Sequence, residues 1–146
     1  MFIDGVDRTN DVSGDLNNWE AIKTITFDDT ATTIAVFGGD GEGGCSNGGF
    51  AMKCTSSHPD WNGLETDTSW KVLGNNGNQD VATSCPAGWA DPSFDDSSWA
   101  NALPGSDHAE SVVGVTDICG DETSWCFRKH VKTGKKIKSI QNLNIN

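Results

Sequence analysis

The stretch that decides the fold is FDDSSWA at residues 94–100, which combines turn-forming residues with two flanking aromatic side chains. Asp and Ser favour turns because their short side chains accept hydrogen bonds from nearby backbone N–H groups. We interpret the stretch as a structural turn that Phe94 and Trp99 anchor in the core. TDTSWK at residues 66–71 has the same character, with Asp67 and Ser69 preceding Trp70.

The chain has 146 residues, of which 35% are hydrophobic, and a formal net charge of −11. This length suits one domain with a single core. The six Trp residues indicate a folded chain, because each can bury a large apolar area and disordered chains contain few of them. No apolar run reaches the ~20 residues that span a bilayer, so membrane insertion is not expected.

Short alternating or β-branched runs, bounded by Gly, Asn and Asp, dominate the sequence and predict an all-β sandwich or barrel. In TIAVF at residues 33–37 both faces are apolar, so this strand is expected to be central. The expected strands are residues 1–3, 21–27, 32–37, 49–54, 70–73, 111–116, 124–131 and 136–145.

Three stretches in this order, TDTSWK, Gly88-Trp89 and FDDSSWA, resemble the galactose-binding-domain-like family of jelly-roll β-sandwiches. The resemblance implies one β-sandwich over residues 1–146 and a carbohydrate as the class of ligand. The family order is rotated here. WCFRK at residues 125–129 resembles the segment with which such a domain opens, and residues 135–146 resemble the strand that runs into Phe2. Residues 126–146 would then supply the strands that normally precede residues 1–6.

Two arrangements explain the rotated order. In a circularly permuted domain, residues 137–145 form a strand antiparallel to the segment that starts at Phe2, and the two termini lie close together. In a tandem array, the same strand completes the sheet of a neighbouring unit by head-to-tail strand addition. We favour the permuted domain, because an open sheet edge promotes aggregation.

The distribution of charge and the cysteine residues indicate which binding partners and which cellular location to expect. All 21 Asp and Glu lie within residues 1–127, whereas six of the ten Lys and Arg lie within residues 128–146. The acidic body would repel phosphates, so nucleic acid is not an expected partner.

The five Cys residues lack metal-type spacing and indicate an oxidising, extracellular setting. Candidate local bridges are Cys45–Cys54 and Cys119–Cys126, which leave Cys85 unpaired or joined to another chain.

The loop SHPDWN at residues 57–62 contains the residue types that bind sugars. An aromatic face covers the apolar side of a sugar ring, while amides and carboxylates bind its hydroxyl groups. Trp61 lies among polar residues and is expected to be exposed, whereas Trp70, Trp99 and Trp125 are expected to be buried. The candidate carbohydrate-binding residues are His58, Asp60, Trp61 and Asn62, with Trp19 as a second aromatic platform.

Four acidic residues, Asp28, Asp29, Asp40 and Glu42, are candidate ligands for a structural Ca2+, which prefers hard carboxylate and carbonyl oxygens. Their pattern does not match the EF-hand loop, so the residue types alone support this hypothesis.

Nothing in the sequence indicates catalysis: the three His residues lack metalloprotease spacing and no G-x-S-x-G motif is present. We therefore expect a non-catalytic extracellular module that binds a carbohydrate or glycoprotein, serves in adhesion and is supported by calcium. The alternative is a structural unit that assembles head to tail, by strand exchange, into a fibre or extracellular matrix. The rotated order and the uneven charge favour the alternative, whereas the loop chemistry and the family resemblance favour the binding module.

Overall fold

The computed structural model describes residues 1–16, 18, 21–39, 45, 48–75, 80–105 and 114–131. Its elements are β1 (Phe2–Ile3), β2 (Val6–Asp7), the 3-10 helix η1 (Thr9–Asp11), β3 (Thr33–Gly39), β4 (Lys71–Asn75), α1 (Val81–Ser84), β5 (Ala100–Asn101), β6 (Leu103–Pro104), β7 (Ile118–Cys119) and β8 (Ser124–His130). All the strand pairs in these ranges are antiparallel, and α1 is a single turn. The prediction of an all-β chain is confirmed.

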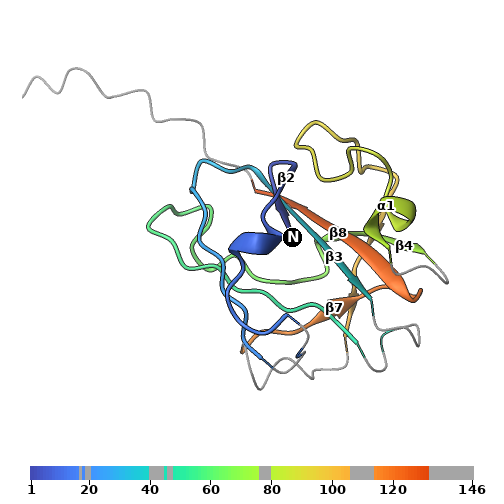
Figure 1. The fold of residues 1–146 in the computed structure, drawn as a ribbon, viewed down its shortest axis with the longest axis horizontal. Coiled ribbons are helices and arrows are strands. Elements are labelled where there is room, and N and C mark those ends of the chain that lie inside the picture. Colours follow the sequence, from blue (N-terminus) through green and yellow to red (C-terminus); the bar gives the residue numbers. More distant parts are fainter. Residues whose placement is uncertain are drawn as a thin grey trace, which may run out of the picture.

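Six strands form one sheet in the order β2-β1-β3-β8-β4-β5, and β6 pairs with β7 in a second, smaller sheet. β3 and β8, of seven residues each, lie side by side through the centre of the molecule (Figure 1). Their register joins Ala35 to Arg128 and Val36 to Phe127. Because β3 has β1 on one edge and β8 on the other, the predicted central position of residues 33–37 is confirmed.

Each face of the large sheet has its own apolar core, because successive side chains of a strand point to opposite faces. On one face, Val72, Trp125 and Phe127 pack with Ile118 of the smaller sheet. On the other face, Ala35 and Cys126 pack against Cys85, Trp89 and Trp99, which come from residues 80–99. Figure 1 shows α1, part of this segment, beside β8. The expected burial of three tryptophans is confirmed, with exposed fractions of 0% for Trp70, 7% for Trp99 and 2% for Trp125.

The hairpin between β1 and β2 turns at Asp4-Gly5, where both residues have positive φ, 47° and 81°. Asp-Gly is a favoured dipeptide for such a two-residue turn, since it tolerates the left-handed backbone conformation. The Asp4 carboxylate also accepts hydrogen bonds from the backbone N–H groups of Thr32 and Thr33, at 2.9 and 2.8 Å. The turn therefore ties the first hairpin to the start of β3.

Two disulfides join distant parts of the chain, Cys45 with Cys119 and Cys85 with Cys126. The candidate local bridges Cys45–Cys54 and Cys119–Cys126 are therefore wrong, and the free thiol belongs to Cys54 rather than Cys85. The reason is that successive side chains of a strand point to opposite faces of the sheet. The Cys126 side chain lies in the core covered by residues 80–99, whereas Cys119 lies in the core on the opposite face.

Several expected strands do not form ladders. Residues 21–27 and 49–54 contain only isolated bridges, Ser13 with Thr24, Phe50 with Ile118 and Lys53 with Glu65, and residues 114–116 form no strand. Within residues 21–27, the side chain of Ile22 is 63% exposed. This run therefore buries too little apolar surface to stabilise continuous strand pairing.

The expected tail strand at residues 136–145 lies outside the described residues, as do residues 111–113 of another expected strand. The intended partner of the tail is already paired on both edges, because β1 lies between β2 and β3. An added strand would therefore have to lie against β2. In the described part of the chain, no helix has the length and apolar character needed to cross a membrane.

Candidate functional site

The loop with the predicted sugar-binding residues is anchored to the core by its own tryptophan. Trp61 is 1% exposed, and its ring packs edge-on against Phe27 with centroids 5.1 Å apart. Its Nε1–H donates a hydrogen bond to the backbone oxygen of Asp29 at 3.0 Å. The prediction that Trp61 is exposed is therefore wrong, because the indole turns inward while its polar neighbours face the solvent. Trp61 cannot offer a ring face to a sugar in this conformation.

The remaining candidates of this loop do lie close together. The imidazole Nδ1 of His58 is 3.8 Å from a carboxylate oxygen of Asp60. The side-chain oxygen of Asn62 accepts a hydrogen bond from the Ser56 backbone N–H at 3.5 Å, which closes the loop on itself. Trp19, the second aromatic candidate, lies outside the described residues. Of the predicted sugar site, the structure therefore brings together the polar residues but no exposed aromatic ring among the described residues.

Two of the four candidate calcium ligands lie among the described residues and two do not. Asp40 and Glu42 lie outside the described residues, whereas Asp28 and Asp29 follow the half-buried Phe27. The Asp28 carboxylate accepts a hydrogen bond from the Thr30 backbone N–H at 2.9 Å, and this contact lowers the pKa of Asp28. Ca2+ takes about six to eight oxygen ligands. Among the described residues, no group of three or more His, Cys, Asp or Glu could hold a metal ion.

The stretch at residues 94–100 has the predicted structural role and also holds a buried arginine. Its turn is closed by Asp95, whose carboxylate accepts a hydrogen bond from the Ser97 backbone N–H at 3.0 Å. Arg128 of β8 donates from Nη1 to the Phe94 backbone oxygen at 3.1 Å and to the Asp96 carboxylate at 3.0 Å. The aromatic ring of Phe94 lies 5.3 Å from the guanidinium carbon. These contacts bind the stretch to the centre of the large sheet.

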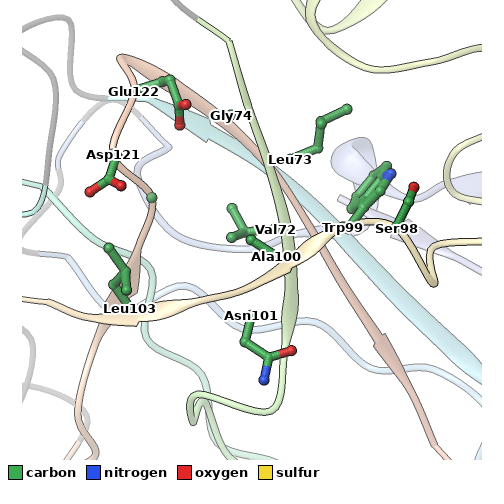
Figure 2. A pocket seen from close by; sticks show the side chains of 11 residues that line it. Val72, Leu73, Gly74, Ser98, Trp99, Ala100, Asn101, Leu103, Asp121 and Glu122 are labelled. Carbon is green, nitrogen blue, oxygen red and sulfur yellow. The ribbon is translucent and has the colours of Figure 1, made fainter.

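A hollow of about 250 Å³ lies at the edge of the large sheet, between β4, β5 and the turn at residues 120–122. Figure 2 shows Asp121 and Glu122 near one another, on the same side of β4 as Val72 and Leu103. Leu103 is 40% exposed, so it offers an apolar surface beside the two carboxylates. Drug-sized ligands occupy pockets of roughly 300–1,000 Å³, and this hollow therefore suits a smaller ligand, of about one sugar ring.

Two glycines shape this hollow. A Cβ atom on Gly74 would overlap the carboxylate of Glu122, so only glycine lets that carboxylate lie against β4. A Cβ atom on Gly120 would lie 2.6 Å from Cδ1 and 3.0 Å from Nε1 of Trp125, so the nitrogen-bearing edge of the indole lies directly behind Gly120.

The polar side chains of the hollow are partly open to solvent and partly bonded to the protein: Asp121 is exposed and Glu122 half-buried, whereas Asn101 is bonded to Lys71. Asp121 and Glu122 form no hydrogen bond or ion pair with any described residue. The ammonium group of Lys71 is bonded to two residues that line the hollow: its Nζ donates to the side-chain oxygen of Asn101 at 2.9 Å and to the backbone oxygen of Trp99 at 3.2 Å. Nε1 of Trp125 is buried and has no partner in the described ranges. A buried N–H without a partner is uncommon in folded proteins.

A second hollow, of about 270 Å³, lies between residues 65–68 and the β6–β7 sheet. Glu65 and Asp67 are its two acidic side chains, and Asp67 is already bound, since it accepts a hydrogen bond from the Ser69 backbone N–H at 2.7 Å and lies 3.6 Å from Nζ of Lys129. We regard the first hollow as the candidate site, because both of its carboxylates lack a partner among the described residues, whereas one of the two in the second hollow is bound.

No family model, curated protein or solved structure matches this chain. The site is therefore argued from its geometry. Sequence reasoning missed it, although Gly120-Asp121-Glu122 is a recognisable acidic turn between two cysteines. What the pattern does not reveal is that this turn lies against Gly74, because that contact depends on the pairing of β8 with β4.

Proposed function

We propose that this chain is a non-catalytic carbohydrate-binding module of an extracellular protein, with a galactose-binding-domain-like jelly-roll fold. The observation that carries the proposal is the hollow beside β4, where the carboxylates of Asp121 and Glu122 lie near the exposed Leu103. Carboxylates accept hydrogen bonds from sugar hydroxyls, and an apolar side chain covers the C–H face of the ring. The resemblance of TDTSWK, Gly88-Trp89 and FDDSSWA to the family supports the fold that we propose.

The two disulfides support the extracellular location, because disulfide bonds form and persist in oxidising compartments. In that setting, a site of about one sugar ring suits adhesion to a carbohydrate or glycoprotein rather than enclosure of a long polysaccharide. Calcium support of the module stays a prediction, because two of its four candidate ligands, Asp40 and Glu42, lie outside the described residues.

A glycan array probed with the disulfide-bonded protein tests this function, followed by calorimetric titration of each sugar that binds. We expect Glu122→Gln to weaken binding about tenfold, the loss expected for one hydrogen bond to a charged group. Asn62→Ala, in the loop at residues 57–62, is the matched control and should leave the affinity unchanged. Loss of binding in the control but not in Glu122→Gln would move the site to that loop. Failure to bind any glycan would refute the function.

The alternative function, head-to-tail assembly by strand exchange, requires a long free strand edge. The edge strands of the large sheet in the described ranges, β2 and β5, have only two residues each. The tail that would supply the added strand lies outside those ranges. No structural observation therefore favours this function over sugar binding.

A further inference from the structure

Two hydrogen-bond donors converge on the carbonyl group that Asp91 contributes to its peptide bond with Pro92. The carbonyl oxygen accepts from the Phe94 backbone N–H at 3.0 Å and from Nη2 of Arg128 at 2.9 Å. The Arg128 side chain has no exposed surface, so bulk water screens its charge little. Donors about 2.7–3.1 Å from the reacting oxygen form the oxyanion holes of acyl-transfer enzymes.

The guanidinium of Arg128 is fixed in this position by its other contacts. Nη1 donates to the Phe94 backbone oxygen at 3.1 Å and to the Asp96 carboxylate at 3.0 Å, and Nε2 of His130 lies 3.3 Å from Nη2. A donor that is already in place stabilises a developing negative charge without reorganising during the reaction. Arg128 is therefore a preorganised donor to the carbonyl oxygen of Asp91.

The side chain of Asp91 supplies a nucleophile on the same residue. Its Oδ1 accepts hydrogen bonds from the hydroxyl and the backbone N–H of Ser93, at 2.7 and 2.8 Å, and these contacts lower the pKa of Asp91. The carboxylate is therefore ionised in mild acid. Its Oδ2 has no hydrogen bond with a described residue and is the oxygen free to react. Attack on the carbonyl carbon of the same residue is intramolecular, which removes much of the entropic cost.

Pro92 provides the leaving group. Asp91-Pro92 is the single Asp-Pro pair of the sequence. The proline nitrogen belongs to a tertiary amide without an N–H and is released as a secondary amine, which takes up a proton readily. Asp91 is exposed and Pro92 half-buried, so the solvent reaches the bond and supplies both this proton and water.

We propose that the chain cleaves itself, once, between Asp91 and Pro92. Oδ2 of Asp91 adds to the carbonyl carbon of its own residue, while the Phe94 N–H and Nη2 of Arg128 stabilise the oxyanion on the former carbonyl oxygen. The C–N bond then breaks, and the nitrogen of Pro92 keeps the electron pair and takes a proton from the solvent. A water molecule opens the cyclic anhydride that remains on Asp91 and leaves two carboxylates there.

The two products stay joined after cleavage. The cut separates residues 1–91 from residues 92–146, but Cys45–Cys119 and Cys85–Cys126 each link the two pieces. The intact molecule therefore gains the mass of one water, and two chains separate only after reduction. This reaction uses the turn at residues 91–94 and Arg128 instead of the hollow beside β4, so it stands or fails independently of sugar binding.

The test follows the disulfide-bonded chain at about pH 5, where carboxylates of ordinary pKa are ionised. The folded chain is compared with chain unfolded in guanidinium chloride at the same pH, by reducing electrophoresis and mass spectrometry. We expect pieces that end at Asp91 and begin at Pro92, formed at least about 100-fold faster in the folded chain, the effect of one oxyanion donor. Equal or slower cleavage in the folded chain, or none, overturns the proposal. A rate that rises with protein concentration also overturns it, since the reaction is intramolecular.

Two matched variants locate the nucleophile. Asp91→Ala removes the attacking carboxylate and should abolish cleavage. Asp95→Ala is the control, because Asp95 closes a similar exposed turn with Ser97 but is followed by Asp96 instead of proline. It should keep the rate of the unmodified chain. Unchanged cleavage in Asp91→Ala, or equal losses in the two variants, contradicts the assigned nucleophile.

Two further variants test the donor and the leaving group. Arg128→Lys keeps the positive charge but not the forked donors of the guanidinium, so cleavage should slow about 100-fold. Circular dichroism establishes whether this variant folds, and a folded variant that cleaves at the full rate overturns the role of Arg128. Pro92→Ala keeps Arg128 in place and makes the bond a secondary amide. It should also cleave much more slowly, and an unchanged rate overturns the mechanism even if Arg128→Lys does not fold.

Discussion

The guanidinium of Arg128 lies 3.0 Å from the carboxylate of Asp96 and joins the centre of the large sheet to the turn at residues 94–100. The Arg128 side chain has no exposed surface, and that of Asp96 is 14% exposed. Burial lowers the pKa of Arg128, while the negative charges of Asp96 and Asp91 oppose this shift. The turn therefore replaces part of the water that the buried guanidinium has lost: Nη1 and Nη2 are bonded, whereas Nε has no partner in the described part of the chain.

Removing Asp96 should be strongly destabilising, because it takes away the carboxylate that is paired with the buried guanidinium of Arg128. We expect Asp96→Ala to lower the free energy of unfolding by about 3–5 kcal/mol, measured by urea denaturation. The control is Asp11→Ala, which removes an exposed pair with Arg8 and should cost about 1 kcal/mol or less. Similar losses in the two variants would show that burial does not distinguish these pairs.

The burial of Trp61 leads to a second stability prediction. Trp61→Ala removes a ring that packs on Phe27 and the hydrogen bond to the Asp29 backbone, so it should cost about 3–5 kcal/mol in the same measurement. The exposed neighbour Asn62 provides the comparison, and its replacement by Ala should cost about 0.5 kcal/mol. An unchanged melting temperature for Trp61→Ala would contradict the burial of this side chain.

The sequence predicts the central strands well, because their apolar runs depend little on which strand lies beside them. Residues 33–37 and 124–131 are examples, and the turn at residues 94–100 follows from its local residue types. Features that depend on tertiary pairing could not be predicted. In the sequence, Arg128 is the first of the six basic residues of the segment 128–146. In the structure, its position in β8 buries its side chain and brings it beside Asp96. The direction of Trp61, the disulfide partners and the contact of Glu122 with Gly74 depend on pairing in the same way.

Acid should destabilise the fold through its turns. The pKa values of Asp7, Asp91 and Asp95 are lowered because the Thr or Ser two residues on donates hydrogen bonds from its side chain and backbone. A lowered folded-state pKa contributes stability above the unfolded value, near 4, and this stability is lost as the pH falls through the folded value. We therefore expect the free energy of unfolding to be nearly constant from about pH 7 to pH 5 and to fall below about pH 4.

Urea denaturation across this pH range measures the effect, with Asp95→Asn as the control. The amide at position 95 cannot ionise, so the variant should lose less stability in acid than the unmodified chain does. Stability that rises below about pH 4 would contradict the assigned direction of these pKa shifts.

The free thiol provides a chemical check of the disulfide pairing. Burial raises the pKa of the Cys54 thiol, so little of it is the reactive thiolate at neutral pH. We expect slow alkylation of one thiol in the native chain, at a rate that increases with pH, and rapid alkylation after denaturation without reductant. Peptide mapping should locate the label at Cys54 and find the other four cysteines cross-linked as Cys45–Cys119 and Cys85–Cys126. A label at Cys85 would overturn this pairing.

The last prediction distinguishes a monomeric binding module from an assembling structural unit. If the basic residues of 128–146 bound the acidic body of another chain, salt would screen the attraction, because the Debye length falls from ~30 Å at 0.01 M to ~8 Å at 0.15 M. A head-to-tail contact need not close, so light scattering at low salt would then show growth that continues with concentration. We expect a monomer at every salt concentration, because the short edge strands β2 and β5 offer little backbone for strand addition. Salt-sensitive growth of the intact chain, abolished by deleting residues 136–146, would instead favour the structural unit over the binding module.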